Sequence, residues 1–419
     1  MNLISPHRWV RRWMCGLAAA SSVAWAQPAP LTLDEAVELA AARSSRVSAS
    51  QAQAEAARQL AVAAGQRPDP VLKFGVNNLP IDGPDRWSLT SDFMTMRSVG
   101  LMQELTRADK RQARAARALG EADAAAIGQR QLTADLQRDA ALAWLERSFQ
   151  QSMRELLMAQ QTEAERQVQA TEAAYRGGKG TQTEVLAART ELELLRDRID
   201  QVDRMAAVAT TQLGRWIGDA ASRPAATRPA LLPPEWAQGN LAEHLTAHPQ
   251  IAGASQQVTL AQADAEIART DKQADWSVEL MYSQRGSAYS NMVSLNLSLP
   301  LQWDQTQRQD RALAARQSQV NRAAAERDDL LRAHEAEVRA MLLEWQSHAA
   351  RLARYDARLV PLSQQRHEAA MSAYRANSGS LSAVLDARRA EIDTRIERLR
   401  IEMDIARLWA QLAFLEGRP

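Results

Sequence analysis

The side chains that most often bind metals or act as nucleophiles are scarce in this sequence. Its 419 residues include six histidines and one cysteine. His244 and His248 lie four positions apart, so a helix would place both on one face, where they could bind a metal ion. Pro249, directly after them, favours a simpler interpretation in which a new helix begins at this point. Met94 and Met96 could contact a soft cation such as copper or silver, although two loop methionines are more often incidental.

Sequence motifs of catalysis are missing as well. The chain has no GxSxG, HExxH or phosphate-loop pattern. Its acidic residues are interspersed with arginines in helical segments, where such charges usually form solvated ion pairs. Cys15 falls in a leader segment that we expect to be removed. We therefore predict a protein that is not an enzyme and that has no catalytic residue, cofactor or metal site.

The residues that do form a pattern belong to a motif that occurs twice. Residues 174–189 read AYRGGKGTQTEVLAAR and residues 373–388 read AYRANSGSLSAVLDAR, an offset of 199 positions without a gap. The identical positions in the first copy are Ala174, Tyr175, Arg176, Gly180, Val185, Leu186, Ala188 and Arg189. Glycine interrupts both helical segments, and Thr181 or Ser380 then offers a hydroxyl that can cap a new helix. The motif predicts two helical hairpins, each with its tip at one copy, and a chain built from two halves.

Residues 1–26 are predicted to be a cleaved signal peptide. Arg8, Arg11 and Arg12 precede an apolar run, and Ala24-Trp25-Ala26 has the small-x-small pattern of a cleavage site. Cleavage would remove three arginines and no acid, so the formal charge would change from +1 to −2. Such a near-neutral chain does not favour a nucleic-acid partner. No later stretch approaches ~18 consecutive apolar residues.

The first half of the chain, residues 27–218, begins with a predicted helix. Thr32 can cap this helix, Glu35 would complete a capping box, and the helix ends near Gly65 before two prolines. Two alternating strands and a long hairpin follow, at about 71–79, 97–105 and 107–217. The proline-free helix that leads to the tip would reach roughly 100 Å at about 1.5 Å per residue.

Residues 219–240 contain four prolines and are predicted to link the halves. The second half, residues 241–419, repeats the plan. It opens with a helix to about Lys272 and continues with two strands and a hairpin, at about 276–283, 291–299 and 305–415. Pro361 interrupts the rise of this second hairpin. Each half thus reads helix, strand, strand, helix, helix.

The four predicted strands each have one apolar and one polar face. In the first strand Leu72, Phe74 and Val76 fall on one side. Membrane barrel strands have this pattern, and so does a soluble sheet that helices cover. Two observations favour the membrane. Trp276 and Trp303 lie at the helix-side strand ends, where interfacial aromatic residues gather. In addition, helices of ~100 Å cannot fold back over strands of ~30 Å as a cover. Four strands cannot close a barrel, so we predict three copies that share twelve strands.

The duplicated helix–strand–strand–helix plan, with its AYR…G…VL.AR tips, resembles the TolC-like outer-membrane efflux channels over essentially the whole chain after the leader. The resemblance implies a mainly α fold with a membrane β-barrel portion. A homotrimer would place a twelve-stranded barrel in the lipid of a Gram-negative outer membrane and a long α-helical tunnel in the periplasm. Conduction would be passive, with the tips docked on a periplasmic adaptor (membrane fusion protein) that joins them to an inner-membrane RND-type pump.

The same resemblance places a set of residues at or beside the adaptor-docking tips. They are Tyr175, Arg176, Gly178, Gly180, Val185 and Leu186 in the first copy, and Tyr374, Arg375, Gly379, Val384 and Leu385 in the second. The second copy has Ala376-Asn377 where the first has Gly177-Gly178, so we expect its turn to differ in shape. Charges near the tips are candidates for holding the tunnel closed, namely Arg189, Asp386 and Arg388, with Arg176 and Arg375. Solvated surface charges are an equally good interpretation.

The substrate is indicated by a softer resemblance. Residues 66–70, Gln-Arg-Pro-Asp-Pro, and the loop from Asn77 to Met96 resemble the heavy-metal efflux branch, which implies exported metal cations. The same channel could instead serve drugs or a type I secretion system. A periplasmic coiled-coil scaffold or adaptor would explain the helices and the leader but not the alternating strands. A scaffold would stay in the soluble periplasmic fraction, whereas a barrel would need detergent for extraction.

Overall fold

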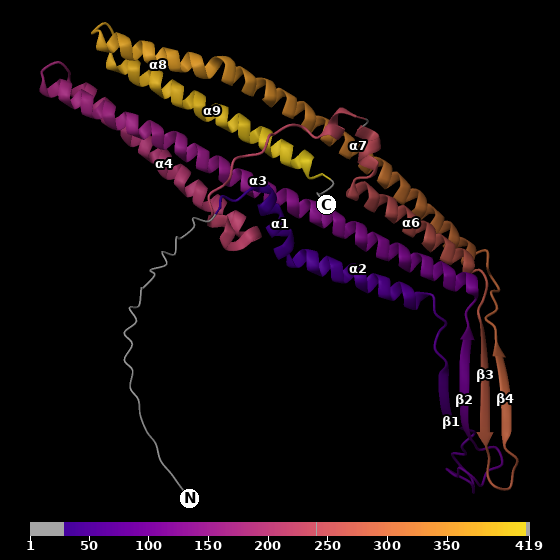
Figure 1. Cartoon of the computed structure of the whole chain (residues 1–419). Helices are drawn as coiled ribbons and strands as arrows, with labels where there is room; N and C mark the ends of the chain where they lie inside the picture. The colour runs from indigo at the N-terminus through magenta and orange to yellow at the C-terminus, as the bar shows by residue number, and fades with distance from the viewer. Residues whose placement is uncertain (1–28, 240, 416–419) are drawn as a thin grey trace, which may run out of the picture.

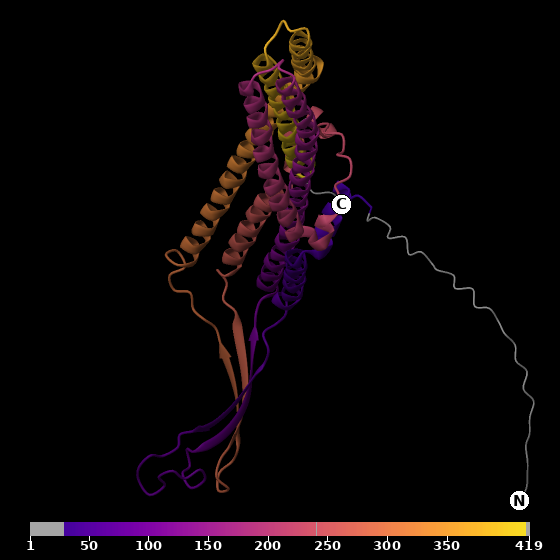
Figure 2. The same cartoon turned by 90° about the vertical axis from the view of Figure 1, so that its left-hand side faces the viewer.

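A computed structural model describes residues 29–239 and 241–415. The predicted signal peptide, residues 1–26 with Cys15, lies outside these ranges. The described chain is elongated, with a four-stranded sheet at one end, two helical tips at the other, and helices between them (Figure 1). Figure 2, turned by 90°, shows the two tips next to each other at the end opposite the strands.

The single helix expected from Thr32 to Gly65 is two helices, α1 (Leu33–Arg43) and α2 (Ser45–Ala64). Thr32 caps α1 as predicted, because its hydroxyl oxygen accepts the Glu35 amide at 3.1 Å. The break lies at Ser44, whose extended backbone (ψ 109°) ends α1 and whose hydroxyl caps α2. The single-helix prediction is wrong because this serine satisfies an amide of a new first turn in the middle of the run.

The first hairpin consists of α3 (Ala108–Arg176) and α4 (Gln182–Ile217). Helix α3 has 69 residues without interruption, which gives roughly 100 Å at about 1.5 Å per residue. The second hairpin rises through α7 (Gln309–Arg354), a π-helical turn (Tyr355–Leu359) and α8 (Val360–Arg375), and returns through α9 (Leu381–Ala413). None of the helices within the described ranges is both long and apolar enough to cross a membrane.

The π-helical turn has a local cause. Pro361 has no amide hydrogen, and its ring crowds the carbonyl four residues earlier, so a regular α-helical bond is lost. The wider turn lies directly before the proline and lets the helix continue beyond it. Arg398 of α9 contacts this turn, with its Nε donating to Asp356 Oδ1 at 2.7 Å. The second hairpin thus has an irregular point midway, whereas α3 is regular throughout.

The sheet contains β1 (Val71–Asn77), β2 (Met96–Leu105), β3 (Trp276–Gln284) and β4 (Met292–Ser298), each pair antiparallel in the order β1-β2-β3-β4. The central ladder pairs Leu101 with Leu280 and Val99 with Tyr282, so the two halves of the chain join here. Strands β1 and β4 are the edges of the described sheet. Its strands end within one or two residues of the predicted positions.

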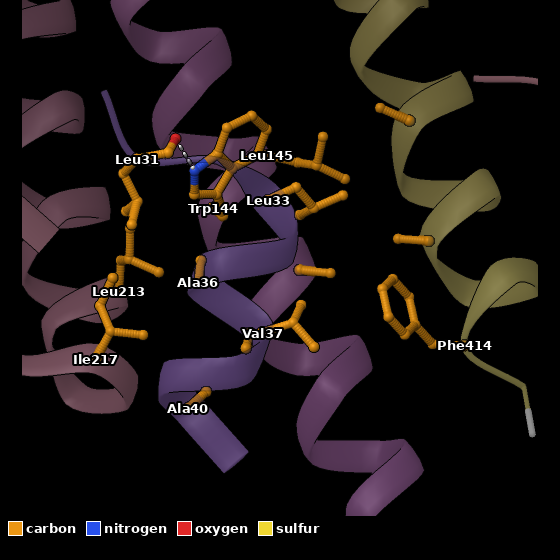
Figure 3. Close-up of a cluster of buried hydrophobic side chains, with 14 of the residues drawn as sticks. Leu31, Leu33, Ala36, Val37, Ala40, Trp144, Leu145, Leu213, Ile217 and Phe414 are labelled. Atoms are coloured by element: carbon orange, nitrogen blue, oxygen red, sulfur yellow. Dashed lines mark hydrogen bonds between the residues drawn. The ribbon is translucent and has the colours of Figure 1, made fainter. Parts of the chain in front are cut away.

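The main hydrophobic core lies midway along the helices, around Trp144 of α3 (Figure 3). The indole ring is fully buried, and its Nε1 donates to the carbonyl oxygen of Leu31 at 3.1 Å. Apolar side chains from α1, α4 and the end of the chain complete the core, among them Leu33, Val37, Leu213, Ile217 and Phe414. Burial of each large side chain contributes about 1.5–3 kcal/mol, so this core holds the helices together at their middle.

The predicted linker crosses the same middle region. Its first part forms a short 3-10 turn at Gly218–Ser222, and its last part forms another at Glu235–Gln238. Between them, Ala225 pairs with Leu31 in a parallel bridge. The linker therefore joins the start of the first half to the core.

The helix expected over 241–272 is also two helices, α5 (Leu241–Thr246) and α6 (Pro249–Thr270). Pro249 is the first residue of α6, where its missing amide hydrogen costs nothing. The prediction that a helix begins at this proline is confirmed. The prediction of one continuous helix over 241–272 is wrong, because the chain starts a new helix at Pro249.

Candidate functional site

One face of the sheet carries exposed apolar side chains in every strand. The register brings together Leu72, Phe74, Val99, Leu101, Val278, Leu280, Tyr282, Val293, Leu295 and Leu297. Phe74 is 76% exposed, Val293 70% and Leu295 64%. A continuous exposed apolar surface marks contact with a membrane or another protein. The sheet extends beyond the helix ends (Figure 1), so the alternative of a sheet covered by the chain's own helices is wrong.

The opposite face of the sheet is polar. Lys73 of β1 and Glu279 of β3 form an ion pair across β2, with Nζ and Oε1 3.1 Å apart. Gly100 of β2 lies opposite Lys73 and has no side chain that would separate the pair. Nearby, the Asn77 side-chain amide donates to Ser98 Oγ at 3.0 Å. The sheet is therefore amphipathic across its thickness.

The two tips have the same backbone conformation. Three turn amides in each copy, at residues 177–179 and 376–378, donate to equivalent carbonyls of the preceding helix at 2.9–3.0 Å. Gly178 has φ +71°, and the equivalent Asn377 has φ +60°. Asparagine tolerates this left-handed conformation better than most side chains. The expected difference in turn shape is therefore wrong, because Asn377 replaces glycine without changing the turn.

The shared glycine that follows each turn is required by close approach. A Cβ at Gly180 would lie 3.3 Å from the amide nitrogen of Tyr175, and one at Gly379 would lie 3.1 Å from the Cβ of Ala373. Both distances are shorter than most Cβ contacts, so a side chain would push the turn away from the helix end. This explains why glycine occupies the same position in both copies.

The helix caps after the two tips differ. Thr181 Oγ1 accepts the Glu184 amide at 3.3 Å, and the Glu184 carboxylate accepts the Thr181 amide at 2.8 Å, which completes a capping box. In the second copy, Ser380 Oγ accepts the Ala383 amide at 3.3 Å. Ala383 stands where the first copy has Glu184, so the second cap lacks the reciprocal bond. Both predicted hydroxyl caps are confirmed.

The residues predicted to dock a partner fall into two groups. Those exposed at the tips include Tyr175, Arg176, Gly178, Leu186 and Arg375. Those buried inside the hairpins are Val185, Val384 and Leu385. Tyr374 is half-buried, because it packs on the small core of Leu381, Val384 and Leu385. Burial, and secondly the charge of nearby Glu184, raise the pKa of its hydroxyl.

The three gate candidates have different surroundings. Arg189 Nη2 donates to Glu172 Oε1 of the same hairpin at 2.6 Å. Its equivalent in the second copy, Arg388, is 5% exposed and donates to the carbonyl oxygen of Gln160 in α3 at 2.7 Å. Burial lowers the pKa of this guanidinium. Asp386 is exposed. It therefore differs from Arg388, which is buried and links the two hairpins through Gln160.

A groove of about 480 Å³ lies between α4 and α9 just behind the tips. Its walls are short hydroxyl, aliphatic and acidic side chains, including Thr183, Ala187, Ser382, Leu385 and Asp386. An ion pair between Arg389 and Glu191 crosses from one helix to the other beside it. This groove was not predicted from the sequence, although the repeated motif supplies both of its walls.

The two histidines with helical spacing do not form a metal pair. His244 stacks on Trp236 with ring centroids 4.6 Å apart, whereas His248 packs on His334 at 4.4 Å. His248 Nδ1 accepts the Gln250 amide at 3.3 Å and caps α6. Burial, and secondly His334, lower the pKa of His248 to about 4. Within residues 29–239 and 241–415, no group of three or more His, Cys, Asp or Glu side chains is placed to hold a metal ion.

Solved structures of other proteins share this architecture. No protein-family model matches the chain, and no curated protein sequence does. A structure of CusC, studied for transmembrane channel formation, is 16% identical with a TM-score of 0.79 and covers 92% of each chain. The outer membrane protein VceC of Vibrio cholerae is 17% identical with a TM-score of 0.75, covering 92% of this chain and 96% of that one. The chain has the fold of outer-membrane channels.

The match to these outer-membrane channels covers 92% of this chain, and so extends over the amphipathic sheet and the long helices. A third structure with this fold, the CmeC outer membrane channel of Campylobacter jejuni, is 13% identical with a TM-score of 0.74 and covers 92% of this chain and 85% of that one. The mainly helical chain with a small antiparallel sheet, which the TolC-like resemblance implies, is therefore confirmed. Because several such channels match about equally well, the fold does not distinguish the heavy-metal branch.

Proposed function

We propose that this chain is the outer-membrane channel of a tripartite efflux system. The observation that carries the proposal is the exposed apolar face of the open four-stranded sheet. In water each large side chain on this face forgoes about 1.5–3 kcal/mol of burial, whereas in the lipid of a membrane the same face is already in an apolar medium. Trp276 and Trp303 are exposed near the helix-side strand ends, where a membrane interface would lie.

The two edge strands of the sheet, β1 and β4, can pair with further copies of the chain. Strands β1 and β4 each have one strand neighbour in the described sheet, so one side of each presents backbone amides and carbonyls. Each such group without a partner costs several kcal/mol in hydrocarbon. Pairing β1 of one copy with β4 of the next removes both edges, and three copies form a closed barrel of twelve strands. The functional unit is a homotrimer in the outer membrane of a Gram-negative bacterium.

The helices then extend the barrel as a tunnel into the periplasm, and the tips meet a periplasmic adaptor. The exposed Tyr175, Arg176 and Leu186, together with the groove between α4 and α9, form the surface that the adaptor contacts. A groove between two helices accepts an amphipathic helix of a partner. The bond of Arg388 to Gln160 and the pair of Arg389 with Glu191 hold the two hairpins together in the resting tip.

Transport through this channel is passive, and an inner-membrane RND-type pump supplies the energy. The exported substrate is a heavy-metal cation, as the resemblance of residues 66–70 and of the Asn77–Met96 loop implies. Drugs, or proteins of a type I secretion system, are the alternative cargo. A conduit needs no tight ligand site, since a substrate that bound tightly would not leave.

The deciding experiment is fractionation of the native protein followed by light scattering, with the mass corrected for detergent. We expect the chain in the outer-membrane fraction, extracted by detergent alone, at the mass of three chains. A water-soluble monomer or dimer from the periplasmic fraction would overturn the channel and leave the coiled-coil scaffold. Metal and drug susceptibility of a deletion strain then separates the substrates, because loss of a metal channel sensitises cells to metals alone.

A further inference from the structure

One charged side chain lies on the apolar face of the sheet. The pairing register puts Arg97 of β2 between Val76 of β1 and Gln284 of β3. Side chains alternate along a strand, so Arg97 shares its face with Val99 and with the other apolar residues. The other charged residues of the described strands all fall on the polar face, namely Lys73, Glu104 and Glu279.

Arg97 lies at the loop end of the sheet, far from the helices. It is the second of the 10 residues of β2, which then runs toward α3 (Figure 1). A strand of this length suits a tilted crossing of a membrane, so each end of β2 would lie near one surface of the lipid. A charge on the lipid side of a barrel costs least at such an end, because a long side chain reaches the headgroups there.

No side chain of the described chain neutralises Arg97. Its Nε is shielded from solvent and makes no hydrogen bond, and no carboxylate of the described residues forms an ion pair with it. Asp92 of the preceding loop is occupied, because its Oδ1 accepts the amides of Met94 at 2.7 Å and Thr95 at 3.1 Å. An ionisable side chain without a partner on a lipid-facing surface indicates a functional contact. The planar guanidinium pairs best with carboxylate or phosphate, to which it donates two parallel hydrogen bonds.

Exposed aromatic side chains occur at the same end of the sheet. Tyr282 is a diagonal neighbour of Arg97 on the apolar face and is 42% exposed. Trp87 and Phe93 of the long loop and Tyr289 of the β3–β4 turn are exposed as well. Aromatic residues of this kind gather at the level of the lipid headgroups. The loop end therefore has the composition of a membrane interface, as the helix-side end has with its tryptophans.

We propose that Arg97 binds the phosphate group of a membrane lipid at the loop end of the apolar face. The acyl chains of this lipid lie on exposed side chains of the same face, such as Val99, Leu101 and Leu280, while its phosphate accepts hydrogen bonds from the guanidinium. Inorganic phosphate lacks the acyl chains and gains only the charge interaction. The placement of this face in lipid rests on the proposed function, whereas the phosphate contact goes beyond it, because conduction requires no lipid-binding residue.

Titration of the purified, detergent-solubilised chain with lipid, followed by native mass spectrometry, tests this contact. The probes are dioleoyl phosphatidylglycerol, dioleoylglycerol, which has the same acyl chains without phosphate, and inorganic phosphate. The site variant is Arg97→Gln, and the matched control is Arg322→Gln, which removes the same charge from an exposed position of α7. We expect the native protein and the control to bind phosphatidylglycerol equally and more tightly than either other probe. The site variant should bind phosphatidylglycerol at least tenfold more weakly.

A second variant, Arg97→Lys, keeps the charge but loses the paired hydrogen bonds, so its affinity should lie between those of native protein and Arg97→Gln. Light scattering in detergent shows whether each variant assembles as the native chain does. Equal phosphatidylglycerol affinity of Arg97→Gln and the control would overturn the site and leave the channel intact. Native protein that binds dioleoylglycerol or inorganic phosphate as tightly would overturn the phosphorylated lipid as the ligand. A water-soluble chain on fractionation would overturn the proposed function, while the titration still decides the site.

Discussion

The two hairpins share a tip motif and a turn conformation, but the rest of the chain holds them differently. Helix α3 is regular over 69 residues and buries side chains along its length, whereas in the 46 residues of α7 the buried ones are His334 and Val338. In the second hairpin most of the buried side chains belong to α9, and polar contacts add to them, such as Arg388 with Gln160 and Arg398 with Asp356. The repeated residues thus set the local turn, while the partners that the rest of the chain offers them, such as Gln160 for Arg388, decide how firmly each hairpin is held.

The largest expected difference between the halves appears at acid pH. His248 is buried, and its pKa of about 4 lies below its ordinary value of 6.5. The neutral ring therefore stabilises the fold fully above pH 6.5, and this contribution, up to about 3 kcal/mol, is lost as the pH falls from 6.5 to 4. Hydrogen exchange, corrected for its intrinsic pH dependence, should show α6 opening more readily on acidification than its counterpart α2.

A matched variant isolates the histidine. His248→Asn keeps an oxygen that can cap α6 but carries no titrating group. Its α6 amides should lose the pH dependence between 6.5 and 4 while α2 amides behave as in the native chain. An undiminished acid response of α6 in this variant would contradict the assignment to His248.

The next prediction concerns two equivalent arginines of the tip motif, Arg388 and Arg189. Arg388→Ala removes a buried charge-assisted bond to Gln160, worth about 1.5–3 kcal/mol, whereas Arg189→Ala removes an exposed ion pair worth about 0–1 kcal/mol. Hydrogen exchange at the start of α9 should accelerate strongly in the first variant. The start of α4 should change little in the second. Equal effects at the two tips would show that burial of Arg388 does not anchor the second hairpin.

The smallest effect tests the turn itself. Gly178→Ala places an ordinary side chain at φ +71° and should destabilise the first tip by about 1–2 kcal/mol. Gly178→Asn copies the second tip and should cost less, because Asn377 already has φ +60° in an otherwise equal turn. Limited proteolysis at the tips reports both. Faster cleavage of the asparagine variant than of the alanine variant would contradict the equivalence of the two turns.

Local sequence patterns predicted most of what short-range interactions control. The caps at Thr181 and Ser380, the faces of the strands and the lengths of α3 and α4 follow from neighbouring residues. The break at Ser44 was missed because a serine in a helical run is compatible with both continuation and capping. The burial of Arg388 was missed because it depends on which helix lies opposite, and Arg189 has the same motif around it but remains exposed. The same holds for the contact of His248 with His334, which are far apart in sequence.

The open edges of β1 and β4 have a consequence for how the protein is made. Under the proposed function, a newly exported single chain would carry two open strand edges and an apolar face through an aqueous compartment, and such surfaces promote aggregation. Association with sister chains would then compete with misassembly, and its success would depend on chain concentration. A periplasmic chaperone that shields the sheet would raise the yield of assembled protein, whereas a fragment containing the helices alone would need no such help.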